Sequence, residues 1–372
     1  MYTILEVNGR KDLMRFIKFP DELYRDCPQY VPALHSDQLR SLTRVSTLSY
    51  CQRKLWLALD GKGKVVGRIC AAINPRYNEL YKVKRARFGW FDVIDDYEVA
   101  RLLFAAAEAW AGENGMEEIH GPLYYNTLGR QGMLVEGFEN IPPFNCIYNH
   151  AYYGRFVEKY GFSKECDWLQ YVLRADQGVP DKTRRVAEML MQRYDLHFAD
   201  IDSLKKDHAL VREFFDVYNR SFYGKVHNFI PFTDEEIEEE IKEMMPFISG
   251  RTSSIVLDGD GKVAAFGIAF PSISRALQKA RGRLFPFGWF HIMRAMHGTE
   301  LCDLMLNGAA PEWQGRGISA VYYSDIAGKA RRSGIKRCIT NPQIESNSAV
   351  NIWNEYEREP YMRRRCYIKK ID

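Results

Sequence analysis

The sequence lacks the features that mark several classes of protein. No stretch approaches the ~20 apolar residues that a membrane-spanning helix needs, and the first residues lack a basic segment followed by an apolar one. The net charge is only +4, from 52 lysines and arginines against 48 acids, which is too small to indicate a nucleic-acid-binding protein. The chain has no low-complexity tract, and its apolar content of 46% is ordinary for a globular protein. We therefore predict an ordered, cytoplasmic protein that binds neither membranes nor nucleic acids.

The cysteines form no recognisable motif. They lack a C-x-x-C pair and have no histidine at metal-ligand spacing, which argues against a zinc site. The eight residues are Cys27, Cys51, Cys70, Cys146, Cys166, Cys302, Cys338 and Cys366. This pattern predicts reduced thiols and no metal.

The chain of 372 residues exceeds what one hydrophobic core usually serves, and the same succession of elements occurs in it twice. In each half, a strand and an amphipathic helix precede two strands joined by the turn Asp-Gly-x-Gly-Lys-Val, near 60 and near 258. The tetrapeptide Phe-Gly-Trp-Phe also occurs twice, at 88–91 and 287–290, although different residues follow it. We predict two tandem modules, residues 1–173 and 196–372, joined by a linker and helix over residues 174–195.

A glycine-containing loop in the second half carries the clearest chemical signal. An apolar run over residues 301–306 leads into this loop, and a helical pattern over residues 320–333 follows. Gly315 and Gly317 let successive backbone N–H groups approach a ligand where the first helical turn leaves its own N–H groups unpaired, and Arg316 adds a positive charge. The loop therefore favours phosphate, although it has neither the Walker spacing nor the dinucleotide fingerprint.

Residues 314–319, Gln-Gly-Arg-Gly-Ile-Ser, resemble the acyl-CoA loop of the GNAT N-acetyltransferase superfamily, Gln/Arg-x-x-Gly-x-Gly/Ala. Serine stands where the superfamily has its final glycine or alanine. The resemblance covers about residues 196–372, and the first half looks like a degenerate partner module in a bacterial two-module protein. It implies an α/β (α+β) fold of two modules, each a mixed, mostly antiparallel sheet flanked by helices. It also implies that acyl-CoA is the co-substrate, its pyrophosphate held by Gln314, Gly315, Arg316, Gly317, Ile318 and Ser319.

Further site residues follow from the same resemblance. The strand before the loop should splay from its neighbour, so that the pantetheine arm pairs with backbone near Asn307 and Ala309. The Asn347 side chain would bond the pantetheine amides, and it could also cap the helix that follows. Asp303 lies where some members carry a general base, and among apolar neighbours its pKa could be raised. It could equally be an exposed strand residue that alternates with buried ones.

The proton donor to the leaving thiolate is less clear from the sequence. The superfamily's usual tyrosine position holds Asn354 here, and Tyr356 lies two residues further on. Two residues turn about 200° around an α-helix, so Tyr356 serves only if the helix is irregular there. Either member of the Tyr322-Tyr323 pair, or Tyr361, could take its place.

The first module should not bind CoA in the usual way. Its turn at residues 92–96 carries three acids where phosphate would have to sit. The resemblance implies an acyl-CoA-dependent N-acyltransferase, in the first place an N-acetyltransferase that uses acetyl-CoA. It moves an acyl group from CoA to a small-molecule amine or amino-acid-like acceptor by direct attack. The alternative is a catalytically inactive acyl-CoA-binding sensor or scaffold. The acceptor, the acyl chain length and the oligomeric state do not follow from the sequence.

Overall fold

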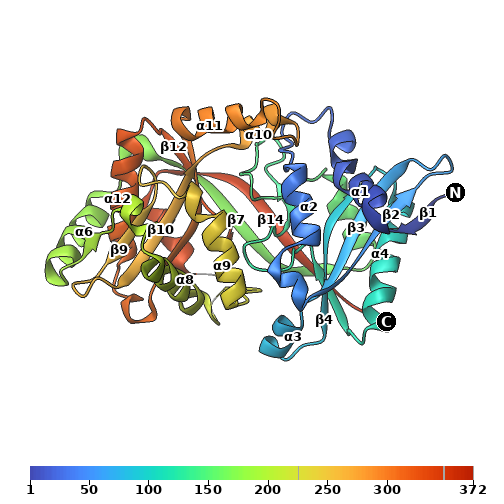
Figure 1. The fold of residues 1–372 in the computed structure, drawn as a ribbon, viewed down its shortest axis with the longest axis horizontal. Coiled ribbons are helices and arrows are strands. Elements are labelled where there is room, and N and C mark those ends of the chain that lie inside the picture. Colours follow the sequence, from blue (N-terminus) through green and yellow to red (C-terminus); the bar gives the residue numbers. More distant parts are fainter. Residues whose placement is uncertain (225, 347, 372) are drawn as a thin grey trace. The chain divides into compact units, whose positions relative to one another are not determined.

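The computed structural model describes residues 1–224, 226–346 and 348–371, which form two compact units (Figure 1). Unit 1 contains Met1–Leu169, Ser274–Ile292 and the chain from Met362 onward. Unit 2 contains Gln170–Ile273 and Met293–Tyr361.

The units are defined by contacts, so they do not coincide with continuous stretches of sequence. The expected first boundary, residue 173, lies inside the long strand β7 (Ser163–Arg174), which begins in unit 1 and ends in unit 2. The last strand, β14 (Arg358–Lys370), pairs with unit 1 through Tyr367–Lys370, because these residues face residues 118–121 in antiparallel register. The division into modules 1–173 and 196–372 stays a prediction about the sequence.

Unit 1 is built on a sheet with the strand order β1-β2-β3-β4-β5-β14, and β6 also pairs with β14. The pairs β1–β2, β2–β3, β3–β4, β5–β14 and β6–β14 are antiparallel, whereas β4 and β5 run parallel. The strands are β1 (Thr3–Glu6), β2 (Gln52–Leu59), β3 (Val65–Ile73), β4 (Arg85–Val93), β5 (Glu118–Gly121) and β6 (Met133–Glu136).

Two helices of unit 1, α1 and α4, pack on this sheet. Helix α4 packs on β2 and β3 (Figure 1) and buries Val99, Leu103 and Phe104 in a core that also holds Phe88 and Phe162. The helices are α1 (Gly9–Leu23), α2 (His35–Thr43), η1 (Ser46–Ser49), α3 (Pro75–Tyr81), α4 (Tyr97–Glu113), α5 (Tyr152–Lys159) and α10 (Ser274–Ala280). Helix α11 (Gly288–Gly298) begins in unit 1 and ends in unit 2.

Unit 2 repeats the arrangement with the strand order β7-β12-β11-β10-β9-β8, and β13 also pairs with β7. The pairs β7–β12, β10–β11, β9–β10 and β8–β9 are antiparallel, whereas β11 and β12 run parallel. The strands are β8 (His197–Phe198), β9 (Ser254–Leu257), β10 (Val263–Pro271), β11 (Leu301–Ala309), β12 (Arg337–Ile339) and β13 (Gln343–Ile344). The helices are η2 (Ala175–Gln177), α6 (Asp181–Arg193), α7 (Ile201–Leu204), α8 (His208–Phe222), α9 (Asp234–Glu243), η3 (Met245–Phe247), η4 (Pro311–Trp313), α12 (Ser319–Arg332) and η5 (Ser348–Glu355).

The two repeated turns have matching geometry. One carboxylate oxygen of Asp60 accepts hydrogen bonds from the N–H groups of Lys62 and Lys64, each at 2.9 Å. The same bonds from residues 260 and 262 reach Asp258 at 3.0 Å. The second glycine of each turn has a φ of 76–78°, which glycine adopts without strain. Each hairpin leads to a parallel strand pair joined by a helix, β4–α4–β5 and β11–α12–β12. The prediction of two modules with mixed, mostly antiparallel sheets is confirmed.

The helical pattern predicted after the glycine loop is also borne out. Helix α12 buries Val321, Tyr322, Ile326 and Ala330, which recur at helical spacing, and it packs beside α6 (Figure 1). Among the described residues, no helix combines the length and apolarity needed to cross a bilayer.

Candidate functional site

Strand β11 carries the edge on which the site is built. It pairs with β10 from Ala309 back to Cys302, and a register shift leaves Met305 without a counterpart on β10, which is a β-bulge. On its other side, β11 pairs in parallel with β12 through residues 301–303, and β12 ends there at Ile339. Since β11 continues to Ala309, the two strands separate over its second half.

The backbone of this free edge points toward the gap that β12 leaves. The Ala310 N–H donates to the Ala264 carbonyl of β10 at 2.9 Å. Successive residues of a strand turn their backbone groups to opposite sides, so Asn307 and Ala309 face away from β10. The Ala309 carbonyl already accepts bonds from Ser221 Oγ at 2.7 Å and Gln314 Nε2 at 2.8 Å. The Ala309 N–H and the backbone groups of Asn307 are therefore the ones oriented for a ligand.

The loop before α12 is open on its outer side. Gly315 and Gly317 have φ of 74° and 79°, a left-handed conformation that favours glycine, and both are exposed. The N–H groups of residues 315–319 donate no hydrogen bond to any described residue, and the N-cap Ile318 provides no side-chain cap. A row of unpaired donors at a helix N-terminus is a favourable place for an anion.

Arg316 adds a full positive charge to this loop. Its guanidinium lies 5.4 Å from the ring centroid of Trp313 and 5.9 Å from that of Tyr194, within the range of cation–π attraction. The side chain is exposed, so its charge remains accessible. Gln314, in contrast, uses its amide within the protein, where it joins the end of β11 to the loop.

Asp303 is buried. It is 0% exposed, and its neighbours Cys302 and Leu304 face the core under α12, so the carboxyl group points to the opposite face of the sheet. Burial raises the pKa of Asp303 to about 7, and the Ser272 side chain counteracts part of this shift. The Ser272 hydroxyl is near enough to act on this pKa, but within hydrogen-bond geometry neither carboxyl oxygen has a partner among the described residues. Of the two alternatives that the sequence left open, the exposed strand residue is excluded.

Tyr356 directly follows η5, which is a 3₁₀-helix rather than an α-helix, so α-helical geometry does not fix the direction of its side chain. Its ring packs 5.4 Å from that of Trp353, which in turn contacts Tyr323 at 4.9 Å. Burial raises the pKa of Tyr356 to about 12, and its hydroxyl has no partner among the described residues. Asn354 is exposed and accepts a hydrogen bond from Arg358.

Tyr322 is a second tyrosine near the free edge. It is buried on α12, in contact with Tyr323 at 4.5 Å. Burial raises the pKa of Tyr322 to about 12, and the Tyr323 side chain and then that of Asn307, a residue of β11, counteract part of this shift. The predicted ligand Asn347 lies outside the described residues.

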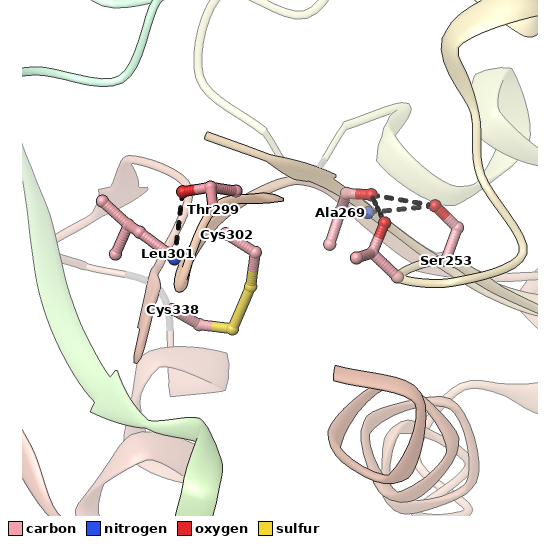
Figure 2. Close-up of a disulfide and its surroundings, with 7 residues drawn as sticks. Ser253, Ala269, Thr299, Leu301, Cys302 and Cys338 are labelled. Carbon is pink, nitrogen blue, oxygen red and sulfur yellow. Dashed lines mark hydrogen bonds between the residues drawn. A yellow bond between two sulfur atoms is a disulfide. The ribbon is translucent and has the colours of Figure 1, made fainter. Parts of the chain in front are cut away.

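The expectation that all cysteines are reduced is wrong for one pair. Cys302 and Cys338 form a disulfide, with their Cα atoms 4.7 Å apart (Figure 2). The parallel register of β11 and β12 places these two residues directly opposite each other. The two cysteines are 36 residues apart, and this spacing gave no sign of the contact. The stretch of chain that the disulfide closes contains residues 314–319.

One group of metal-ligand type lies in unit 1. His120, Glu165 and Cys366 bring a nitrogen, an oxygen and a sulfur atom within 4.8 Å of one another. Arg85 pairs with the same glutamate at 2.9 Å, and burial lowers the pKa of His120 to about 4. These contacts describe a buried hydrogen-bonded cluster, in which the arginine already neutralises the carboxylate.

The repeated β–α–β arrangement, together with the exposed glycine loop in unit 2, defines the fold of tandem GNAT proteins. A solved tandem GNAT protein from the clavulanic acid biosynthesis pathway matches 100% of this chain and 99% of its own, with a TM-score of 0.58 at 12% identity. A GCN5-related N-acetyltransferase from Sphaerobacter thermophilus matches 100% and 96%, with a TM-score of 0.57 at 11% identity. A glucosamine N-acetyltransferase region of a fungal multi-domain β-N-acetylglucosaminidase gives a TM-score of 0.60 at 14% identity, where the chain spans 38% of that protein.

Two curated bacterial proteins resemble the chain in sequence. Protein YghO from Escherichia coli is 28% identical over 379 aligned residues, which cover 98% of this chain and 94% of that protein. The bacterial ceramide synthase from Caulobacter vibrioides is 26% identical over 84% of this chain and 81% of its own length. No family model matches the chain. The structural likeness establishes the acyltransferase fold, and it leaves the reaction itself to be proposed.

Proposed function

We propose that the protein is an acyl-CoA-dependent N-acyltransferase, with its site in unit 2. The observation that carries this proposal is the exposed loop of residues 315–319, whose N–H groups are unpaired beside the free edge of β11. The loop would hold the CoA diphosphate through backbone donors, with Arg316 supplying charge. The backbone of Asn307 and the N–H of Ala309 would pair with the pantetheine amides.

Direct transfer needs two proton movements and no protein nucleophile. The amine nitrogen attacks the thioester carbonyl carbon, so that a C–N bond forms, the C–S bond breaks and the thiolate leaves. In this proposal Asp303 is the general base that accepts the proton of the attacking amine. Its pKa of about 7 suits this role near neutral pH. The thiolate would take its proton from Tyr356, with Tyr322 as the alternative donor because it lies beside Asn307.

The acceptor is proposed from chemistry. A ceramide is an amide of a long-chain amino alcohol, so the name of the Caulobacter relative is consistent with acylation of an amine. We therefore include long-chain amino alcohols and fatty acyl-CoA, beside small amines and acetyl-CoA, among the substrates to be tested. Unit 1 would contribute no CoA site, because the Asp96 carboxylate accepts the Glu98 N–H at 2.9 Å and caps α4 where a phosphate would bind.

A pair of glycine variants tests the loop. Gly315 and Gly334 have nearly equal positive φ, 74° and 75°, and a Cβ at either would meet nothing within 4 Å. Gly315→Asp and Gly334→Asp should therefore lose similar stability, about 1 kcal/mol each. Only Gly315→Asp places a carboxylate beside the bound diphosphate. Calorimetric titration with CoA should show at least tenfold weaker binding for Gly315→Asp and unchanged binding for Gly334→Asp, and equal affinities would refute the assigned loop.

The second candidate is an acyl-CoA-binding sensor without turnover. It is favoured by Asn354, which stands where the superfamily's usual tyrosine would be. Release of free thiol from acyl-CoA in the presence of the amines separates the two functions. An enzyme releases thiol in proportion to amide formed, whereas a sensor binds acyl-CoA and releases none.

A further inference from the structure

An exposed aromatic cluster lies on the segment between β10 and β11. Nine large hydrophobic side chains are strongly exposed in the described part of the chain, and five of them fall within residues 285–293. Their exposed fractions run from 48% to 73%. The five are Phe285, Phe287, Trp289, Phe290 and Met293. A concentration of this kind marks a surface that has a partner.

Helix α11 presents part of this cluster on one face. At about 100° per residue, Trp289, Phe290, Met293, Arg294 and His297 fall within an arc of about 140°, and all five are exposed. The residues on the other side of the helix, such as those at 292 and 295, are half-buried. Ile292, Ala295 and Met296 make this inner side apolar as well. The helix differs from one that only packs on a core because its exposed face also carries three large apolar side chains.

The charge of this segment is as uneven as its hydrophobicity. Residues 274–298 contain five basic residues and no acidic one, so the rest of the chain has a net charge of −1. The five are Arg275, Lys279, Arg281, Arg283 and Arg294, and all are exposed. None of them makes an ion pair with a residue that the structure describes. Exposed aromatic rings among unpaired cations suit a partner whose interior is apolar and whose surface is anionic.

The first part of the segment, residues 274–282, is held to the rest of unit 1 by hydrogen bonds. Ser274 Oγ donates to the Pro142 carbonyl at 2.8 Å, and Gln278 Nε2 donates to the Pro28 carbonyl at 2.7 Å. The His35 N–H donates to the Gly282 carbonyl at 2.9 Å.

A hollow of about 910 Å³ lies beside these hydrogen-bonded residues, within unit 1. Arg25, Lys279, Arg281 and Arg283 line it, and its one carboxylate, Asp21, is hydrogen-bonded to a histidine at 2.7 Å. A cationic hollow next to exposed rings is a suitable place for phosphate headgroups.

We propose that residues 274–298 form a surface that docks on bilayers containing anionic phospholipids. The aromatic side chains insert at headgroup depth, where Trp and Phe are favoured, and the arginines contact the lipid phosphates. A second copy of this chain is a poorer occupant, because a two-fold contact would bring two acid-free basic segments together. This proposal differs from the expectation that the protein has no membrane partner, and it does not depend on the proposed acyl transfer.

Co-sedimentation of the full chain with vesicles tests the proposal. We expect binding to vesicles of 30% phosphatidylglycerol in phosphatidylcholine, and at least tenfold weaker binding to phosphatidylcholine alone. The variant Trp289→Ser/Phe290→Ser should lose most of the binding, whereas Phe247→Ser, which removes a ring that is also 55% exposed, should retain it. Vesicle binding that is equal in both variants would overturn the assignment.

A second pair of variants tests the charge. Arg281→Gln/Arg283→Gln should bind about 25-fold more weakly, at about fivefold per cation, while Arg155→Gln/Arg331→Gln should bind as the wild type does. All four arginines are exposed, so each variant should fold, and thermal unfolding checks this. If sedimentation without vesicles shows a dimer that the Trp289→Ser/Phe290→Ser variant cannot form, the surface is an interface between copies, and the membrane proposal fails.

Discussion

Replacing Asp303 by asparagine should make the protein more stable at pH 8 and should flatten part of its pH dependence. The folded pKa of this buried carboxyl is about 7, against an ordinary value of 3.8. Between these values the folded chain holds a proton that the unfolded chain has lost, so stability falls as the pH rises from about 4 through 7. From pH 5 to pH 8, this one group removes about 2.5 kcal/mol from the free energy of unfolding. Asparagine cannot ionise and has nearly the same shape.

Urea unfolding of both proteins at pH 5 and pH 8, followed by tryptophan fluorescence, measures this effect. The stability difference between Asp303→Asn and the wild type should increase by about 2.5 kcal/mol from the lower to the higher pH. Every other group titrates alike in the two proteins and cancels. A difference that does not change with pH would refute the assignment of a raised pKa to this carboxyl.

Asp167 provides the matched control because it is equally buried but paired. Burial by itself would raise its pKa, but hydrogen bonds from Arg365 at 2.8 Å and from Lys164 and Arg363 at 3.2 Å lower it. The ionised form is therefore stabilised in the fold, and this stability is lost as the pH falls through the lowered pKa. Asp167→Asn should destabilise the protein at pH 8, the opposite of Asp303→Asn, since it removes the charge of a fully buried carboxylate that accepts hydrogen bonds from three cations.

Three other substitutions test separate parts of the structure. Tyr356→Phe should change the melting temperature little, because the hydroxyl has no partner in the structure described, but it should lower kcat about 100-fold. If kcat falls this much only in Tyr322→Phe, then Tyr322 rather than Tyr356 is the proton donor. Arg68→Ala should lower the free energy of unfolding by about 3–5 kcal/mol in denaturant titrations, since it leaves Asp92, its buried partner at 2.7 Å, unpaired. Cys302→Ser should cost about 4 kcal/mol for a 36-residue loop, and a reductant should destabilise the wild type but not this variant.

Much of the site could be predicted because it depends on neighbours in the chain. The left-handed glycines 315 and 317, the helix that follows them and the turn at Asp60 are set by local backbone preferences. A glycine, an aspartate or an apolar stripe at helical spacing has the same effect in most surroundings. The sequence therefore indicated the loop, its helix and the repetition of the module.

Contacts between residues that are distant in the sequence could not be predicted from local backbone preferences. The disulfide depends on the register of two strands 36 residues apart, and the burial of Asp303 depends on what covers the other face of β11. Alternation along a strand shows that Asp303 and Cys302 face opposite ways, but it does not show that both faces are covered.

The tetrapeptide Phe-Gly-Trp-Phe shows most clearly the difference between what the local sequence determines and what tertiary packing determines. At 88–91 it lies in β4, where Phe88, Trp90 and Phe91 are at most 5% exposed, and at 287–290 its three rings are 48–70% exposed. The sequence by itself determined the turns, the glycine loop and the two-module plan, because these rest on backbone geometry and on side chains a few positions apart. Only the tertiary structure decided which rings are buried and which face solvent. Burial is a property of what packs on a segment, and identical residues carry no information about that.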